Sequence, residues 1–160
     1  MRAWVGALLV FVGVHGRGAG AQAVRPATAV RSLVRLDAVA ATNSSVQLGA
    51  GLIVPAGTYL RTEWVAAAGA ARVEDDTRMA GRVDGLVRFV IDPFAESRRA
   101  VHALGGVSAM YDGVEWQPRL VAGLGIEGRR RGAVRWSAEV AVGGGIRIGV
   151  AARRLRPNRR

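Results

Sequence analysis

Apolar and polar side chains alternate with a period of two along most of the chain after residue 29. The alternation is clearest in residues 57–68 and 78–91. In residues 57–68, Leu60 and Trp64 share one parity while Glu63 has the other. Successive side chains of a β-strand point to opposite faces of the sheet. The two segments therefore predict a β-hairpin with one apolar and one charged face.

An amphipathic helix is the competing interpretation of residues 78–91, because apolar positions there also recur at helical spacing. Gly81 and Gly85 argue against a helix, since each glycine costs about 1 kcal/mol in a helix interior. Phe89 would also lie off the apolar stripe of such a helix. We therefore expect a strand.

The same alternation recurs along the chain, and the segments that show it are separated by Gly, Pro, Asn, Asp or Ser. The expected strands are residues 29–40, 46–54, 57–68, 78–91, 99–111, 118–127, 134–142 and 146–153. The expected connections are turns at 55–57, 92–97 and 128–132 and a longer acidic loop at 69–77. Strands of this number and length suffice to close a small transmembrane barrel. The predicted fold class is all-β, a closed antiparallel up-and-down eight-stranded transmembrane β-barrel.

The alternation alone allows two arrangements of these strands. In a transmembrane barrel the apolar face meets lipid and the charged face lines a narrow lumen. In a soluble periplasmic barrel that binds an apolar ligand, the strands turn inside out and the charges face water. The soluble alternative places four large apolar residues inside the barrel: Leu60, Trp64, Val83 and Phe89.

The N-terminus has the order of features found in a secretory signal peptide. Arg2 precedes an apolar stretch at 3–14, and Ala21-Gln22-Ala23 forms an A-x-A cleavage site. We expect cleavage after this site. The chain then divides into a signal peptide at 1–23, a lead-in at 24–28, a barrel domain at 29–154 and a basic tail at 155–160.

Composition narrows the possible functions. The chain has 160 residues, enough for one domain, and no cysteine, so neither a disulfide framework nor a thiolate metal site is available. Its 23 basic residues, all of them arginine, outnumber its 12 acidic residues and give a formal charge of +11. Nucleic acid is nevertheless a poor partner for an exported chain.

The signal peptide, the alternating segments and a glycine-rich final hairpin at 143–152 together make a recognisable pattern. In this pattern the chain resembles the small outer-membrane β-barrel proteins of Gram-negative-type bacteria. The resemblance implies a location in the outer membrane, contact with outer-membrane lipid and insertion by the barrel-assembly machinery. It also implies a structural or interaction role, for which we expect the 69–77 loop to be the contact surface. We expect the arginines of the C-terminal tail to contact anionic lipid or cell-wall groups.

Most of the charged residues lie on the polar face of the predicted strands. The arginines there are Arg31, Arg35, Arg61, Arg78, Arg82, Arg88, Arg119, Arg135, Arg147 and Arg153, and the acids are Asp37, Glu63, Asp84, Glu127 and Glu139. An eight-stranded barrel has room for side chains but not for an open pore, so these groups should pair with one another. The predicted lumen charge network comprises Arg61, Glu63, Arg82, Asp84, Arg88, Arg119, Glu127, Arg135, Glu139 and Arg147. Alternatively, the surplus arginine forms an anion site.

Pairing within the hairpin of residues 57–91 can be predicted from its charges. Inward positions are odd in one strand and even in the other, so the numbers of two opposed residues sum to an odd value. A sum of 145 sets Glu63 opposite Arg82 and Arg61 opposite Asp84. We predict that register because both pairs are complementary.

The aromatic residues have two possible roles. In a membrane barrel they form girdles at the two lipid–water interfaces, and in a soluble barrel they are ordinary packing residues. The candidates for interfacial positions are Trp64, Phe89, Tyr111, Trp116 and Trp136.

Catalytic chemistry has little support in the sequence. His102 is the one histidine left after removal of the signal peptide, and Ser108 lies about 20 Å further along its strand. A lipid-modifying enzyme would need Ser137, from another strand, or another hydroxyl beside His102. We expect no catalytic residues, no metal site and no cofactor, and we interpret His102 as a hydrogen-bonding residue of the lumen.

Overall fold

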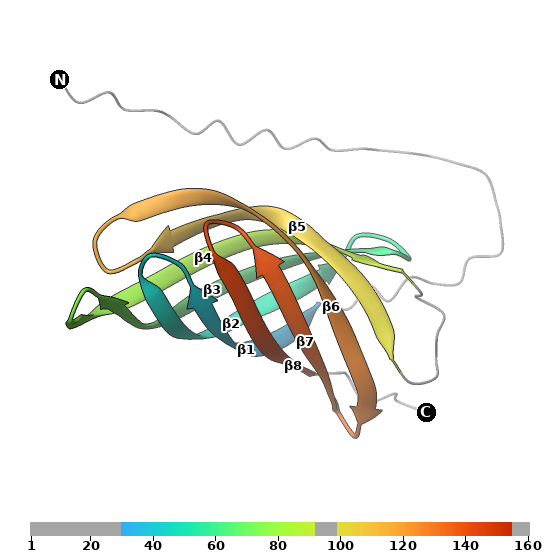
Figure 1. The fold of residues 1–160 in the computed structure, drawn as a ribbon. Helices are drawn as coiled ribbons and strands as arrows, with labels where there is room; N and C mark the ends of the chain where they lie inside the picture. Colours follow the sequence, from blue (N-terminus) through green and yellow to red (C-terminus); the bar gives the residue numbers. More distant parts are fainter. Residues whose placement is uncertain (1–29, 92–98, 155–160) are drawn as a thin grey trace, which may run out of the picture.

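The structure is a closed antiparallel β-barrel (Figure 1). This computed structural model describes residues 30–91 and 99–154. The expected signal peptide, lead-in, basic tail and turn at 92–97 lie outside the described residues. Within residues 30–91 and 99–154, no helix has the length and apolarity needed to cross a membrane.

The strands follow one another around the barrel in chain order. They are β1 (Arg31–Ala40), β2 (Ser44–Pro55), β3 (Leu60–Val73), β4 (Asp76–Val90), β5 (Ala100–Tyr111), β6 (Trp116–Arg131), β7 (Val134–Val142) and β8 (Ile146–Arg154). β1 pairs with β8 as well as with β2, with Val34 opposite Ala152, and this pairing closes the sheet. Closure removes the unpaired edges that an open sheet would expose. The predicted all-β, closed, eight-stranded antiparallel barrel is confirmed.

The barrel has two ends that differ in their connections. The ends of the described chain and the connections at 56–59 and 132–133 lie at one end, called here the terminal end. The turns at 41–43, 74–75, 112–115 and 143–145 lie at the other, called here the far end. In Figure 1 the β3–β4 hairpin projects past the neighbouring turns of the far end.

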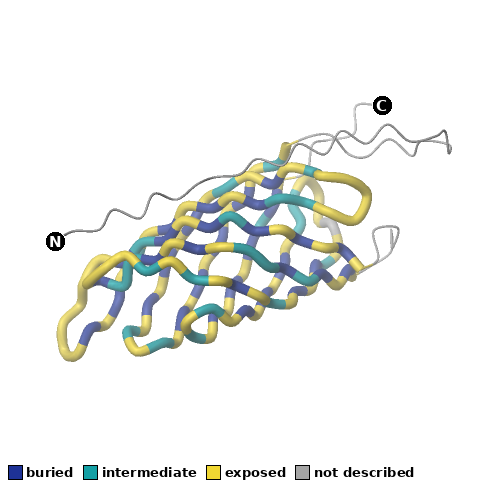
Figure 2. Tube along the Cα trace, turned by 90° about the horizontal axis from the view of Figure 1, so that it is seen from above, coloured by how far each residue is buried: buried dark blue, intermediate teal, exposed yellow. Residues whose placement is uncertain are grey.

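Apolar side chains face outward and charged side chains face inward. Trp64, Phe89 and Ile148 are 54%, 46% and 58% exposed, whereas Arg82 and Arg147 are only 2% and 6% exposed. Figure 2 shows the buried and exposed positions alternating along the strands. The alternation read from the sequence is therefore the alternation between outside and lumen.

The inside-out arrangement expected for a soluble carrier is wrong for this chain. The residues that it places inside, Leu60, Trp64, Val83 and Phe89, are all exposed. The interior instead contains a charged centre and small apolar clusters, one of which is formed by Leu33, Ile53 and Val65. An apolar ligand would therefore have to displace buried ion pairs to enter.

The prediction of an acidic loop at 69–77 is wrong. Strands β3 and β4 continue through most of this segment, and only Glu74 and Asp75 form the turn between them. Glu74 has a φ of 55°, which is in the left-handed region used by tight two-residue hairpin turns. The charged side chains of this segment lie on a long hairpin rather than on a flexible loop.

The register predicted for this hairpin is also wrong. Glu63 lies opposite Leu86 instead of Arg82, and Arg61 lies opposite Arg88 instead of Asp84. The two-residue turn sets the register, because it places Val73 opposite Asp76 and every earlier pair follows from that one. The like charges of Arg61 and Arg88 are tolerated because each contacts a carboxylate.

The turn expected at 128–132 is shorter than predicted. β6 continues to Arg131, and its pairing with β7 shifts between Glu127 and Arg130. This irregularity is a bulge, which adds a residue to one strand and increases the local twist. The turn expected at 55–57 lies at 56–59 and is one residue longer than predicted.

Candidate functional site

The structure places the predicted lumen charge network inside the barrel at different depths. The buried members are Glu63, Arg82, Asp84, Arg88, Glu127, Glu139 and Arg147. Arg61, Arg119 and Arg135 are half-buried and lie nearer the ends. Arg78, which the alternation also assigned to the lumen, is exposed on the projecting β3–β4 hairpin, with its Nη2 3.7 Å from Asp76 Oδ2.

Arg35 is the centre of the network, although it was not among the residues predicted to form it. Its Nη1 donates to Glu63 Oε1 at 3.0 Å and its Nη2 to Glu139 Oε2 at 3.2 Å. Its Nε and Nη2 also donate to the two carboxylate oxygens of Asp37 at 2.8 and 2.7 Å. One guanidinium group thus joins carboxylates from β1, β3 and β7. The alternation placed Arg35 on the polar face, but it carries no information on which arginine reaches the axis.

A second cluster lies toward the terminal end, around Glu127. This carboxylate contacts Arg61 at 3.5 Å, Arg135 at 3.3 Å and Arg88 at 3.6 Å. It also forms an ion pair with Arg153. Arg153 is another residue that the alternation placed on the polar face but that was not predicted as a network member.

A third cluster lies toward the far end, around Asp84. Its Oδ2 is 2.9 Å from Arg82 Nε and 3.1 Å from Arg147 Nη1. Arg82 also donates from Nη2 to Asp37, which connects this cluster to Arg35. Buried charges are tolerated when they are paired and hydrogen-bonded. The clusters together occupy the centre of the barrel with ion-paired side chains.

His102 is completely buried and lies beside two carboxylates. Its Nε2 is 3.3 Å from Glu139 Oε1, and its Nδ1 is 4.0 Å from Glu127 Oε1. Ser137 also donates to Glu139 Oε1, at 3.5 Å. Both side chains thus contact one carboxylate oxygen in the sealed interior. A general base must reach a substrate, and this histidine has 0% of its surface exposed.

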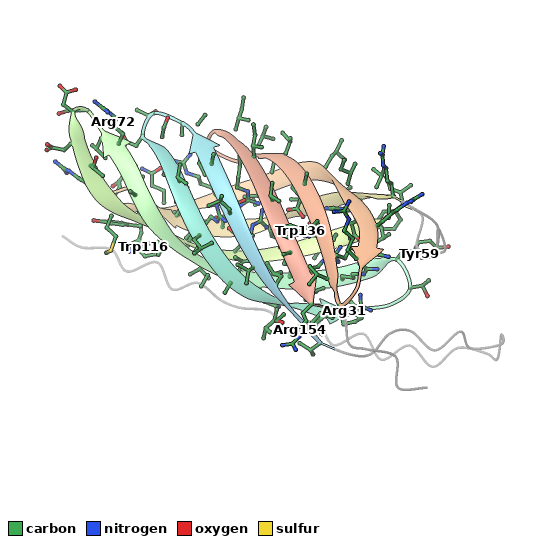
Figure 3. The ribbon with its side chains drawn as sticks, turned by 90° about the horizontal axis from the view of Figure 1, so that it is seen from below. Arg31, Tyr59, Arg72, Trp116, Trp136 and Arg154 are labelled. Atoms are coloured by element: carbon green, nitrogen blue, oxygen red, sulfur yellow. The ribbon has the colours of Figure 1, made fainter. Side chains whose placement is uncertain are left out.

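The aromatic residues lie on the outside, near both ends of the barrel. Trp64, Phe89, Trp116 and Trp136 are exposed. Tyr111 is half-buried against Trp116 at the far end, with ring centroids 5.6 Å apart. Figure 3 shows Trp116 toward the far end and Tyr59 toward the terminal end.

At the terminal end, Tyr59 and Phe89 stack with their ring centroids 5.9 Å apart. Tyr59 was not among the predicted interfacial aromatics, because the alternation in residues 57–68 placed it on the polar face of that segment. It lies in the turn before β3, where strand alternation does not apply. The described chain thus carries aromatic pairs at both ends of the apolar surface.

Metal binding has no candidate site in the part of the chain that the structure describes. Residues 30–91 and 99–154 contain no group of three or more His, Cys, Asp and Glu side chains that could hold a metal ion. The acidic side chains of the lumen instead contact arginines.

Comparison with known proteins gives no family. No family model matches the chain, and no curated protein matches it. One solved structure, described as "De novo design of transmembrane beta-barrels", is similar with a TM-score of 0.46 and 15% identity. The match covers 77% of this chain and 94% of that chain. The class of the protein therefore follows from its own geometry: a closed eight-stranded barrel with an apolar exterior and an ion-paired interior.

Proposed function

We propose that this chain is a small outer-membrane β-barrel protein of the bacterial envelope, with a structural or interaction role and no open pore. One observation carries the proposal. Large apolar side chains are exposed on the outward face of the strands, while the arginines and carboxylates of the lumen are buried. Soluble monomeric proteins rarely expose large contiguous apolar surfaces, whereas a lipid-embedded barrel requires one.

The strand lengths are compatible with a bilayer. The shortest strands, β7 and β8, have 9 residues each, and about 9–11 tilted residues span the hydrocarbon core. The aromatic pairs near both ends lie where the interfacial girdles of such barrels occur.

The filled lumen supports the absence of a pore. Arg35, Glu63 and Arg88 are each no more than 2% exposed and are bonded across the barrel. An ion would have to break these buried pairs in order to pass. In a planar bilayer, we expect the purified barrel to show no steady conductance, and stable channel openings would contradict this part of the proposal.

The projecting tip of the β3–β4 hairpin is the proposed contact surface. It carries Glu74, Asp75 and Asp76, with Arg72 and Arg78 beside them, and all five are exposed. Arg31 and Arg154, at the ends of β1 and β8, lie at the opposite end of the barrel (Figure 3), so periplasmic termini would place this tip outside the cell. In that orientation the arginines of the tail at 155–160 would face periplasmic cell-wall groups or anionic lipid.

Localisation tests the proposal directly. The full chain is expressed in a Gram-negative host, the envelope is fractionated on a density gradient, and outer-membrane fractions are compared on gels with and without boiling. We expect the barrel in the outer membrane, with a mobility that changes on boiling and an N-terminus that begins at Val24. A protein recovered in the soluble periplasmic fraction, with the same mobility in both lanes, would refute the proposal.

We propose that the barrel is not an enzyme, because His102 and Ser137 are sealed in the interior. Replacing His102 with glutamine tests this point in cells that produce the protein. We expect unchanged envelope lipid composition. A lipid species that appears with the wild-type chain and disappears with His102→Gln would indicate catalysis, provided that both proteins show the same heat-dependent gel mobility.

A further inference from the structure

A small cavity lies inside the barrel at the far end and has about 20 Å³ of room. Its polar side chains come from Arg82, Ser108, Arg119 and Arg147. Apolar side chains and backbone of the 143–145 turn form the rest of its wall. No carboxylate from the described part of the chain lines this cavity, so three positive charges face a space with no negative one.

Each of the three arginines has a nitrogen with no protein acceptor in the described ranges. These atoms are Arg82 Nη1, Arg119 Nε and Arg147 Nη2. Arg82 and Arg147 are 2% and 6% exposed, so bulk water does not solvate their guanidinium groups. Buried donors are nearly always satisfied in folded proteins, and those that are not point to a ligand or a strained site.

The same arginines are held in position by their other nitrogens. Arg82 Nε and Arg147 Nη1 both contact Asp84 Oδ2, at 2.9 and 3.1 Å. Arg119 Nη1 donates to the Gly144 carbonyl oxygen at 2.6 Å. Asp84 shares one oxygen between Arg82 and Arg147. Asp37, the other carboxylate that contacts Arg82, is shared with Arg35, so these two carboxylates face three arginines. The remaining donors are thereby fixed in place without being neutralised.

We propose that this cavity, formed by Arg82, Ser108, Arg119 and Arg147, is a binding site for a small inorganic anion of halide size, with chloride as the physiological ligand class. The guanidinium N–H groups and the Ser108 hydroxyl are donors, as an anion requires. The volume exceeds the roughly 10–15 Å³ that one water molecule needs but leaves little room for a tetrahedral oxyanion. This inference does not depend on the location of the barrel in a membrane.

Arg119 is the most exposed of the three arginines that line the anion site. Its side chain is half-buried and contacts the 143–145 turn at the rim. Gly144 admits this contact, because a Cβ at that position would overlap the Arg119 guanidinium group.

Chloride-dependent stability tests the site. The full-length barrel, folded in detergent micelles, is unfolded with urea in sodium chloride and in sodium gluconate of equal ionic strength. At a chloride concentration tenfold above the dissociation constant, we expect the folding equilibrium constant to rise about elevenfold over gluconate. The effect should saturate with chloride. An identical response to both salts would refute the proposal, because it would show screening or water in place of a bound anion.

Arg119→Gln and Arg135→Gln form a matched pair of variants. Both remove one half-buried arginine charge, but Arg119 lines the cavity and Arg135 lies near the terminal end beside Glu127. We expect Arg119→Gln to lose most of the chloride-dependent increase and Arg135→Gln to keep it. An equal loss in the two variants would contradict the assignment of the site.

A second measurement does not depend on stability. The width of the ³⁵Cl resonance is recorded with wild-type barrel, with Arg119→Gln and with Arg147→Gln. We expect broadening that bromide reverses and inorganic phosphate does not, with at least a severalfold reduction in either variant that folds. Stronger competition by phosphate than by bromide would refute a halide-sized site, as would undiminished broadening in both variants.

Discussion

Arg35 on β1 donates to Glu63 on β3 at 3.0 Å, across the strand β2 that lies between them in the sheet. The contact is made through the lumen and not along the sheet, and both side chains are almost completely buried. Arg35 also contacts Glu139 on β7 at 3.2 Å, across the strand β8 on the other side of β1. A single guanidinium group therefore connects β1, β3 and β7, and this cross-lumen pairing gives the barrel its solid interior.

Removal of the Arg35 charge tests this role. Arg35→Met preserves much of the side-chain volume but leaves Asp37, Glu63 and Glu139 with fewer partners. We expect a loss of about 3–5 kcal/mol in the free energy of unfolding, because a buried carboxylate without its partner is strongly destabilising. Urea titration in detergent micelles measures the change.

Arg72→Met is the matched control, since the ion pair that Arg72 forms with Asp75, at 3.7 Å, is exposed. Exposed pairs contribute about 0–1 kcal/mol, so this variant should unfold close to the wild type. Similar losses in the two variants would show that the central arginine has no special structural role.

An arginine introduced on the outward face should lower the folding free energy strongly only where that face contacts hydrocarbon. Leu124 lies near the middle of β6 and is 62% exposed, and Val114 lies in the β5–β6 turn and is 56% exposed. If the barrel spans a bilayer, Leu124→Arg should cost about 2–4 kcal/mol of folding free energy and Val114→Arg about 0–1 kcal/mol. Folding into lipid vesicles, followed by urea titration, gives both values. Equal costs at the two positions would argue against a lipid-facing belt.

Two adjacent glycines on β5 should differ sharply in their tolerance of a methyl group. At Gly106 a Cβ would overlap the Gly85 carbonyl oxygen on β4, whereas at Gly105 the nearest atom would be 3.7 Å away. Gly106→Ala should therefore destabilise the barrel by about 1–3 kcal/mol, because the backbones must move apart. Gly105→Ala should be neutral or stabilising by up to about 1 kcal/mol. Thermal unfolding of both variants distinguishes them, and an equally stable Gly106→Ala barrel would contradict the close strand contact.

The β5–β6 turn should depend on pH through Asp112. The backbone N–H of Glu115 and that of Val114 donate to its Oδ1 at 3.1 and 3.0 Å, and Asn43 donates to Oδ2 at 3.2 Å. Chiefly because of the Glu115 bond, the pKa of Asp112 lies below its ordinary value of 3.8. The folded-state pKa is thus lower than the unfolded one, so the stabilisation is present above pH 3.8 and is lost as the pH falls through the folded value.

Asp112→Asn should therefore change turn stability at neutral pH and lose that difference in acid. Hydrogen exchange at the Val114 and Glu115 amides, measured from about pH 6 down to about pH 2, reports the protection of the turn. We expect the wild type to lose protection relative to the variant over the acidic part of this range. A difference that stays constant with pH would show that the Asp112 carboxylate does not hold the turn.

Local pattern was sufficient to place side chains on the correct face of each strand. Trp64 and Ile148 were assigned outside, and Arg82 and Arg147 inside, from parity alone. The strand period of two is a property of the backbone and needs no knowledge of the neighbouring strands. The number of strands and their order around the barrel followed from the same repeated pattern.

The strands, their two faces and their closure into a barrel could therefore be predicted from the amino-acid pattern. The register of β3 on β4, the central position of Arg35 and the meeting of Arg82, Arg119 and Arg147 at one cavity could be learned only from the folded chain. The physical reason is that parity is local, whereas register depends on turn geometry and cross-lumen distances depend on how the strands stagger when the sheet closes. Glu63 therefore reached Arg35 and Arg88 instead of the predicted Arg82.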